Sequence, residues 1–174
     1  RIAWQTRHWP GVALFLDHSD AALAMQIGNY YFNGGAYDLA RAEDAYRKAV
    51  AIDQKILWGH YQLARILFIG GDFNRALEEI SAELEAHPEN LRSLYIRGLI
   101  YGYAGDLDRA EGDFRRFTEW APKEWAGYND LAWIQSKRGS YAAARTTIQR
   151  ALQEVRDSEK NPWLWNSLGV AELN

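Results

Sequence analysis

One short polar run carries the side-chain types of a nucleophilic catalyst. It is Asp17-His18-Ser19-Asp20. A catalytic triad needs a nucleophile, a base and an orienting acid that converge from separate parts of a fold. Four adjacent residues do not converge in this way, so the run predicts no catalytic site. We expect Ser19 or Asp20 to cap the helix that follows, because their side-chain oxygens accept hydrogen bonds from free helical amides.

The histidines show no spacing that is typical of a metal site. They are His8, His18, His60 and His87, and no two of them stand four positions apart on one helical face. The chain has no cysteine, which excludes disulfides, thiolate ligands and cysteine nucleophiles. We expect His60 to pack between paired helices and His87 to be solvated. The sequence predicts no metal and no cofactor.

Two other motif types also have ordinary structural explanations. The acidic pairs Glu78-Glu79 and Glu83-x-Glu85 fall in a helical segment, where a solvated face explains them better than carboxylate catalysis. The pairs Gly34-Gly35 and Gly70-Gly71 match no phosphate-binding loop. They are expected to form turns in which glycine supplies left-handed backbone geometry. We therefore predict that this chain is not an enzyme.

The composition is that of a globular protein rich in helix. Of the 174 residues, 48% are hydrophobic and 25% are charged, and the net charge is −3. An acidic chain without a basic run argues against nucleic acid as a partner. The longest apolar stretch, residues 12–16, is far too short to insert directly into a membrane. Only four prolines and an abundance of Ala, Leu, Glu and Arg favour helices over strands.

A repeat of about 34 residues runs through the chain. A small residue stands seven positions before a turn glycine in four copies and opens a fifth, at Gly28, Ala64, Gly98, Ala132 and Gly169, with spacings of 36, 34, 34 and 37. After each turn, apolar residues recur at helical spacing, which predicts a second helix. The extra residues of the longer copies are expected in connections, around residues 36–37 and 156–160. A period near 34 is typical of arrays of helix pairs.

Capping residues mark where these helices begin and end. The second helices are expected to begin after Asp38, Asp72, Asp106 and Ser140, and two first helices after Asn90 and Asn161. Each of these side chains can accept a hydrogen bond from a free amide of the first helical turn. Pro88 and Pro122 fall between copies, where a helix must stop.

The repeated residues resemble the tetratricopeptide repeat family. The resemblance rests on Gly98-x-x-Tyr101, Ala110-x-x-x-Phe114 and Pro122, and on similar fragments in the other copies, such as Ala76-x-x-x-Ile80 and Trp165-x-x-Leu168-Gly169. It implies an all-α fold, an α-solenoid of stacked antiparallel helix pairs in a right-handed superhelix. We expect repeat units at about 21–54, 57–90, 91–124 and 125–160 and a half-unit at 161–174. Gln135 departs from the family pattern, since it replaces an aromatic residue.

The ends of the chain carry separate expectations. Residues 1–20 are expected to form a short capping helix and a linker, because Ala13-Leu14-Phe15-Leu16-Asp17 is in register with the end of a second helix. Alternatively, the Trp and Arg residues between Arg1 and Trp9 could mark a region just outside a membrane. The sequence stops after a first helix, and we expect the natural chain to continue beyond Asn174.

The resemblance places a ligand on the concave face that the first helices of the pairs build. Aromatic and basic residues at helical spacing predict a peptide-binding groove, since these residue types dominate binding hot spots. The alternative is that these aromatic side chains pack between neighbouring first helices. The expected lining residues are Asn29, Phe32, Trp58, Tyr61, Arg65, Phe68, Arg92, Tyr95, Leu99, Tyr103, Trp133, Lys137 and Trp163.

The leading hypothesis is a non-enzymatic module that binds a peptide or protein segment in this groove. Some members of the family hold a C-terminal carboxylate with a clamp of Lys, Asn, Asn, Lys and Arg. The aligned residues here are Met25, Asn29, Gln62, Arg92 and Ile96, of which only Asn29 matches, so we expect no clamp. The alternative is a structural spacer or self-assembly domain of a larger, membrane-anchored protein, with self-association through its terminal helices. A third hypothesis is that the repeats position a substrate for a catalytic domain outside this sequence.

Overall fold

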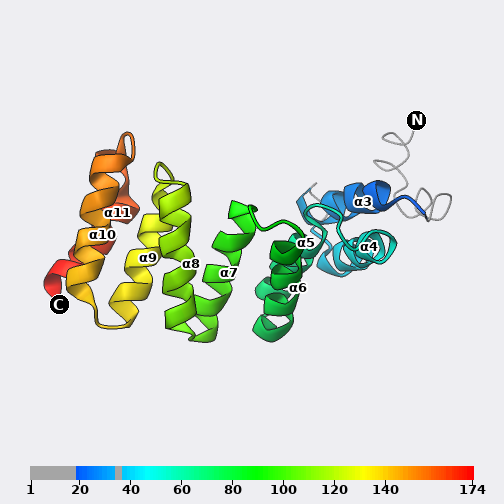
Figure 1. Cartoon of the computed structure of the whole chain (residues 1–174), viewed down its shortest axis with the longest axis horizontal. Helices are drawn as coiled ribbons and strands as arrows, with labels where there is room; N and C mark the ends of the chain where they lie inside the picture. The colour runs from blue at the N-terminus through cyan, green and yellow to red at the C-terminus, as the bar shows by residue number, and fades with distance from the viewer. Residues whose placement is uncertain (1–18, 34–36) are drawn as a thin grey trace. The chain divides into compact units, whose positions relative to one another are not determined.

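The computed structural model describes residues 19–33 and 37–174, and these form helices joined by short connections (Figure 1). The chain divides into two compact units, which we call unit 1 (residues 1–88) and unit 2 (residues 89–174). The described part of unit 1 holds α3 (Ala21–Asn33), α4 (Leu39–Ile52), α5 (Gly59–Ile69) and α6 (Phe73–Ala86). Unit 2 holds α7 (Leu91–Ala104), α8 (Leu107–Trp120), α9 (Trp125–Lys137), α10 (Tyr141–Glu154), the 3₁₀ helix η1 (Ser158–Lys160) and α11 (Pro162–Leu173).

Consecutive helices pack as pairs within each unit. In unit 1, α3 packs against α4 and α5 against α6, and α4 also contacts α5. In unit 2, α7 pairs with α8 and α9 with α10, and α11 packs against both α9 and α10. We call α3, α5, α7, α9 and α11 the first helices and α4, α6, α8 and α10 the second helices. The all-α class and the paired helices confirm the expected fold.

Most of the expected helix caps are formed. Asp38, Asp72 and Asp106 each accept a hydrogen bond from the backbone amide three residues ahead, at 3.0, 3.2 and 3.1 Å. Asn90 caps α7 in the same way, and Asn161 caps α11 by accepting from the amide two residues ahead. These bonds satisfy amides that have no partner inside the helix, which explains why the second helices begin where they do.

Two details of the helix starts refine the sequence expectations. Asp20 caps α3, because its carboxylate accepts a hydrogen bond from the amide of Leu23 at 3.0 Å. The helix start expected after Ser140 is confirmed, since α10 begins at Tyr141, but the Ser140 side chain does not make the expected capping hydrogen bond. The helix ends at Ala86 and Trp120 agree with the breaks expected at Pro88 and Pro122.

The turns inside three pairs rely on glycine. Gly71, Gly105 and Gly139 have φ values of +79°, +89° and +75°, a region that side chains with a Cβ rarely adopt. Gly70 has an ordinary helical φ of −74°, so only the second glycine of that pair is needed for its conformation. The turn expected at Gly34-Gly35 lies outside the described residues.

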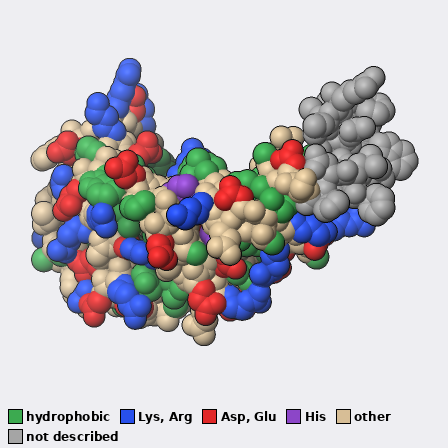
Figure 2. All heavy atoms as spheres, turned by 45° about the vertical axis from the view of Figure 1, so that its right-hand side comes forward, with side chains coloured by type: hydrophobic (Ala, Val, Ile, Leu, Met, Phe, Trp, Pro, Cys, Tyr) green, Lys and Arg blue, Asp and Glu red, His purple; other side chains and the backbone are tan. Residues whose placement is uncertain are grey.

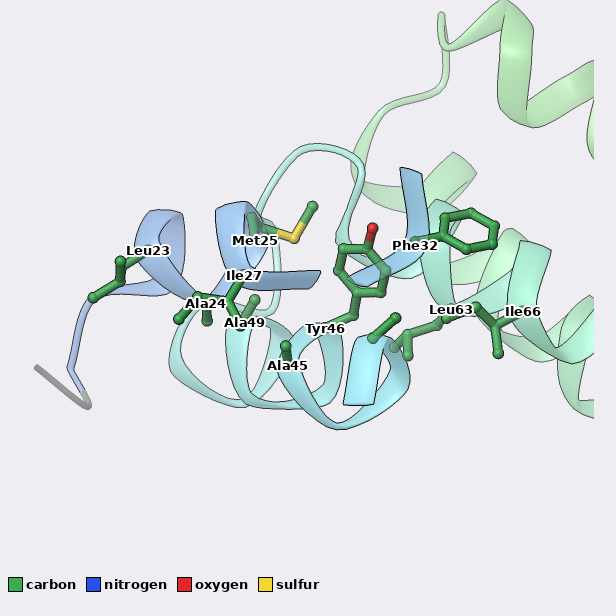
Figure 3. Packing of buried hydrophobic residues seen from close by; sticks show 11 residues of the cluster. Leu23, Ala24, Met25, Ile27, Phe32, Ala45, Tyr46, Ala49, Leu63 and Ile66 are labelled. Atoms are coloured by element: carbon green, nitrogen blue, oxygen red, sulfur yellow. The ribbon is translucent and has the colours of Figure 1, made fainter. Parts of the chain in front are cut away.

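The core of each pair is built from small residues of the first helix and large residues of the second. A Cβ added at Gly28 would lie 2.4 Å from the ring of Tyr46, and one at Gly98 would lie 3.0 Å from the ring of Phe114. Tyr46 is completely buried, and it belongs to one hydrophobic cluster with Leu23, Ala24 and Ala45 (Figure 3). The repeated small residues therefore let a bulky side chain lie directly against the helix backbone.

Several expectations fall on the part of the chain that is not described. The capping helix expected in residues 1–20, the Trp and Arg residues near its start, His8 and His18 lie outside the described residues, apart from Ser19 and Asp20. The proposed repeat boundaries stay a prediction. Across residues 19–33 and 37–174, no helix is long and apolar enough to cross a membrane.

Candidate functional site

The first helices differ from the rest of the chain in their charge. The only acidic residues in their sequences are Asp130 and Glu172, whereas Arg65, Arg92, Arg97 and Lys137 are basic. The second helices carry both signs, and on the face drawn in Figure 2 Lys and Arg side chains are interspersed with Asp and Glu. The first helices therefore carry more basic than acidic residues, although the whole chain is acidic and Arg97 is already paired with Asp113 at 2.7 Å.

In unit 1, aromatic rings and a guanidinium form a connected row. The rings of Trp58 and Tyr61 meet edge to face, with centroids 5.1 Å apart. The guanidinium of Arg65 lies 5.6 Å from the Tyr61 ring and 4.5 Å from the Phe32 ring. Phe32 is only 5% exposed, so it supports Arg65 from inside the core and offers little surface to a ligand.

Polar side chains of unit 1 fix this row in place. The side-chain oxygen of Asn29 accepts hydrogen bonds from the hydroxyl of Tyr46 at 2.8 Å and from the amide of Gln62 at 3.1 Å. Gln62 in turn accepts a hydrogen bond from Arg65 at 2.8 Å. Burial raises the pKa of the Tyr46 hydroxyl above its usual range, so it stays a donor to Asn29. The Asn29 side-chain oxygen is thus already used for packing α3 against α4 and α5.

In unit 2, three of the expected residues come together near the ends of α7 and α9. We call Tyr103, Trp133 and Lys137 the unit 2 patch. The rings of Tyr103 and Trp133 are 5.3 Å apart, and the ammonium of Lys137 lies 4.7 Å from the Trp133 ring. Tyr103 is 58% exposed, and Lys137 is exposed as well. The patch thus offers aromatic surface and a cation side by side.

A glycine in α7 makes room for the patch. A Cβ at Gly102 would lie 2.9 Å from the Trp133 ring and 2.7 Å from Ile134. Because Gly102 has no side chain, the Trp133 ring lies directly against the backbone of α7. The Gly102 carbonyl also accepts a hydrogen bond from Lys137 at 3.4 Å, which holds the ammonium beside the ring.

Tyr95 is tied into a chain of polar side chains that crosses unit 2. Its hydroxyl donates a hydrogen bond to the carboxylate of Asp130, which also accepts one from Asn129 at 3.1 Å. Asn129 in turn accepts a hydrogen bond from Ser167 at 2.8 Å. Burial raises the pKa of Asp130, although both hydrogen bonds oppose this effect. This series of hydrogen-bonded side chains therefore links α7, α9 and α11.

The remaining expected residues occupy varied environments. Phe68 is half-buried against Phe73, with ring centroids 5.9 Å apart. Leu99 is partly buried beside the cluster around Phe114. Arg92 is exposed in the first turn of α7, at the opposite end of that helix from Tyr103. Trp163 is 62% exposed in the first turn of α11. Among the expected residues of unit 2, those of the unit 2 patch contact one another through their rings and the Lys137 ammonium.

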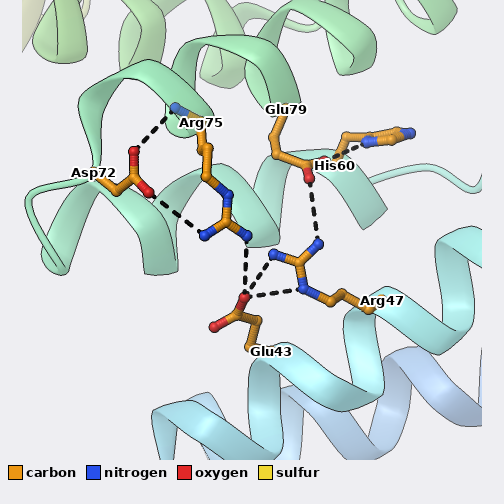
Figure 4. Close-up of polar contacts among 6 residues, drawn as sticks. All are labelled: Glu43, Arg47, His60, Asp72, Arg75 and Glu79. Carbon is orange, nitrogen blue, oxygen red and sulfur yellow. Dashed lines mark hydrogen bonds and ion pairs between the residues drawn. The ribbon is translucent and has the colours of Figure 1, made fainter.

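Several polar residues of unit 1 have environments that the sequence reading missed. The acidic pairs were expected on a solvated face, but Glu83 is only 1% exposed, and Glu79 bonds Nδ1 of His60 at 2.7 Å. Arg47 bridges Glu43 and Glu79 between α4 and α6 (Figure 4). His87, expected to be solvated, is half-buried with its ring 3.0 Å from the carbonyl of Lys55. Among the described residues, no cluster of His, Asp and Glu could hold a metal ion.

Comparison with known proteins identifies the repeat. A family model described as tetratricopeptide repeat matches residues 61–101 and 97–159, more than half of the chain. The chain belongs to the tetratricopeptide repeat family. The Ala-x-x-x-large motifs of α6, α8 and α10 lie within the matched residues.

Two curated relatives contain similar tetratricopeptide segments. The peptidyl-prolyl cis-trans isomerase PASTICCINO1 of Arabidopsis thaliana is 28% identical over 123 residues, which are 62% of this chain and 19% of that protein. The BBSome complex member BBS4 of Bos taurus is 23% identical over 155 residues, which are 89% of this chain and 29% of that protein. This chain therefore spans less than a third of either relative.

Solved tetratricopeptide structures share the fold. The protein MamA has a TM-score of 0.77 at 18% identity, covering 83% of this chain and 84% of MamA. YrrB, described as having an unusual peptide-binding site, has a TM-score of 0.78 at 16% identity, covering 96% of this chain and 84% of YrrB. The first tetratricopeptide domain of Spaghetti (RPAP3), bound to the HSP90 peptide SRMEEVD, has a TM-score of 0.65 at 22% identity, covering 71% and 97%.

Proposed function

We propose that this tetratricopeptide chain is a non-enzymatic interaction module that binds a peptide segment of a partner protein on the faces of its first helices. The observation that carries the proposal is the unit 2 patch, where two aromatic rings and an ammonium group lie together at an exposed surface. Aromatic side chains supply a large contact area at a small cost in side-chain entropy. Exposed aromatic and basic residues that cluster in this way are typical of binding hot spots.

The chemistry of the patch suggests a ligand with an apolar anchor and an acidic group. An aliphatic or aromatic side chain of the ligand would lie on Tyr103 and Trp133. An acidic group would pair with Lys137, whose ammonium is held between the Trp133 ring and the Gly102 carbonyl. Because this geometry exists before the ligand arrives, binding would lose little entropy in ordering the site.

Two structural neighbours are consistent with such a ligand. YrrB is described by its peptide-binding site, and the RPAP3 domain holds the peptide SRMEEVD, which combines Met and Val with three acidic residues. The carboxylate clamp expected for some members of the family is matched here only by Asn29. We therefore propose recognition of a side-chain anchor with an acidic neighbour, and not of a free chain end.

The proposal can be tested with peptides selected from a phage library of random sequences. Selected peptides, labelled with fluorescein, would be titrated with the wild type, Tyr103→Ala and Lys137→Glu, and binding measured by fluorescence anisotropy. Each of these two variants should bind the peptides at least about tenfold more weakly than the wild type, a loss of about 1.4 kcal/mol. Trp120→Ala is a matched control on the second helix α8. Trp120 is 44% exposed, and the guanidinium of Arg116 lies 4.2 Å from its ring centroid, so it too combines an exposed ring with a cation. Equal affinity for all four proteins would exclude the patch.

A second candidate function, self-association through a terminal helix, is favoured by the surface of α11. This helix buries Leu164, Leu168 and Ala171 but exposes four large apolar side chains, at Trp163, Trp165, Val170 and Leu173. Exposed apolar side chains gathered on one helix favour contact with another protein surface. Sedimentation velocity of the wild type and of Trp163→Ser/Leu173→Ser would test it: a dimer lost in the variant supports self-association, and a monomeric wild type excludes it.

A further inference from the structure

Unit 1 contains a cleft of about 690 Å³ that none of the expected ligand contacts lines. We call it the α4–α6 cleft, because Val50 and Ala51 of α4 and Ala82 and Ala86 of α6 line it, together with Leu63 of α5. Its volume is in the range of sites that bind small molecules or short peptide segments, about 300–1,000 Å³. Its charged lining residues are Arg47, Lys55, His60, Glu79 and Glu85.

Most of these charges neutralise one another inside the protein. Glu79 bonds His60 through one carboxylate oxygen, and its other oxygen lies 3.8 Å from Arg47 (Figure 4). Arg47 also pairs with Glu43 at 2.6 Å. This network is therefore part of the packing between α4, α5 and α6, and it leaves little charge for a ligand.

Two opposite charges at the cleft are left over. Lys55 comes from the connection between α4 and α5, and Glu85 from the last turn of α6. Both residues are exposed, and neither forms an ion pair within the part of the chain that the structure describes. The cleft therefore presents one available cation and one available anion, with an aliphatic surface formed by both helices.

The connection that carries Lys55 is held in one conformation. The backbone amide of Lys55 donates a hydrogen bond to the Asp53 side chain at 2.9 Å, and its carbonyl lies 3.0 Å from the ring of His87. The amide of Trp58, at the end of the same connection, donates to Glu83 of α6 at 2.9 Å. A fixed rim lowers the entropy that a ligand must lose on binding.

We propose that the α4–α6 cleft is a second binding site, for a short peptide segment that carries an aliphatic side chain between an acidic and a basic residue. The acidic residue pairs with Lys55 and the basic residue with Glu85. The aliphatic side chain packs on Val50 and Ala82. The small side chains of Ala51, Ala82 and Ala86 let the ligand approach the helices closely. This site is separate from the unit 2 patch and does not depend on it.

The test uses the whole chain and the probe acetyl-Ala-Glu-Leu-Lys-Ala-amide, with acetyl-Ala-Gln-Leu-Gln-Ala-amide as the neutral comparison. Binding is followed through the backbone amide signals of Ala51, Ala82 and Ala86 in heteronuclear NMR titrations. The charged probe should give saturable shifts at these three residues and bind about tenfold more tightly than the neutral probe, about 1.4 kcal/mol. Shifts that do not saturate, or equal affinity for both probes, would overturn the proposal.

Charge variants locate the interaction. Lys55→Glu and Glu85→Lys should each lower the affinity for the charged probe about tenfold, because each variant places two like charges at the cleft. The double variant Lys55→Glu/Glu85→Lys should recover most of the affinity, since the probe can bind in the reverse direction. Lys48→Glu is the control, because Lys48 is an exposed residue of α4 that does not line the cleft. A loss of affinity with Lys48→Glu, or an affinity that the double variant does not recover, would contradict the proposed site. Tyr103→Ala should leave this binding unchanged, which separates it from the patch.

Discussion

The carboxylate of Glu83 accepts a hydrogen bond from the backbone amide of Trp58 at 2.9 Å, across 25 residues of sequence. Trp58 precedes α5 with a left-handed φ of +72° and has no side chain that caps the helix. Glu83 also accepts from the amide of Tyr61 at 3.2 Å. A buried acid of α6 thus serves as the N-terminal cap of α5, where a negative charge also complements the helix dipole.

Glu83 is expected to stabilise unit 1 more than any exposed acid of α6. Glu83→Ala removes the carboxylate that accepts hydrogen bonds from the amides of Trp58 and Tyr61, so the free energy of unfolding should fall by about 1–3 kcal/mol. Glu83→Gln should lose less, because its amide oxygen still accepts one hydrogen bond. Glu85→Ala is the control two positions along, with an expected change within about 0.5 kcal/mol. Urea denaturation measures all three, and equal losses for Glu83→Ala and Glu85→Ala would contradict the capping role.

The helix pairs could be predicted from the sequence because their signals are local. A cap such as Asp72 needs only an amide three residues away. The small residues that recur about every 34 positions show the length of the repeat directly. Glu83 could not be assigned in this way, because its partner lies 25 residues distant. One signal was present: Glu83 follows Ala76 and Ile80 on the buried stripe of α6, and an acid on such a stripe must find a partner inside.

The candidate site could be predicted only in part. Helical spacing assigned Tyr103, Trp133 and Lys137 to the same side of the first helices, and the structure brings their side chains into contact. Their role in binding stays a prediction. It did not show that the ring of Phe32 is buried or that the Tyr95 hydroxyl is bonded to Asp130. Spacing tells which side of a helix faces inward, but the neighbouring side chains decide how much of each residue stays exposed.

Equivalent glycines of the repeat should respond in opposite ways to alanine. At Gly28 a Cβ would collide with the buried Tyr46 ring at 2.4 Å, whereas at Gly169 nothing lies within 4 Å. Gly28→Ala should therefore destabilise the chain by about 1–3 kcal/mol through overpacking. Gly169→Ala should be neutral or stabilise it by up to about 1 kcal/mol, since alanine favours the helix. Thermal unfolding of both variants checks this, and a stable Gly28→Ala would show that Tyr46 can move aside.

His60 should make the stability of unit 1 depend on pH. Its hydrogen bond to Glu79 raises its pKa, burial opposes the rise, and the charges of Glu79 and Glu83 and a bond to the backbone of Gln54 add to it. Arg47 lies 3.8 Å from Glu79, and Arg47 and Lys55 line the same cleft as the pair. The protonated ring is thus favoured in the folded state. Its contribution is complete below about pH 6.5, the pKa of an unfolded histidine, and disappears as the pH rises through the raised folded pKa.

The difference in unfolding free energy between the wild type and His60→Gln isolates this effect, because the other titrating groups are common to both proteins. We expect the substitution to cost more at pH 6 than at pH 9. Urea denaturation at both values gives the comparison. A difference that does not change with pH would mean that the pair with Glu79 contributes equally whether or not the ring is charged.

The bond between Tyr95 and Asp130 should couple the two residues in stability and in titration. Burial raises the pKa of Asp130, and the hydroxyl of Tyr95 opposes the rise. Tyr95→Phe should therefore raise that pKa further, which carbon NMR of the carboxyl group measures. Because a raised carboxyl pKa costs stability as the pH rises through it, the substitution should cost more at pH 7 than at pH 4, about 1–3 kcal/mol at neutral pH. A double-mutant cycle with Asp130→Ala should give a coupling energy of about 1 kcal/mol or more. Additive losses would show that Tyr95 acts only through its ring contacts with Phe114 and Phe117.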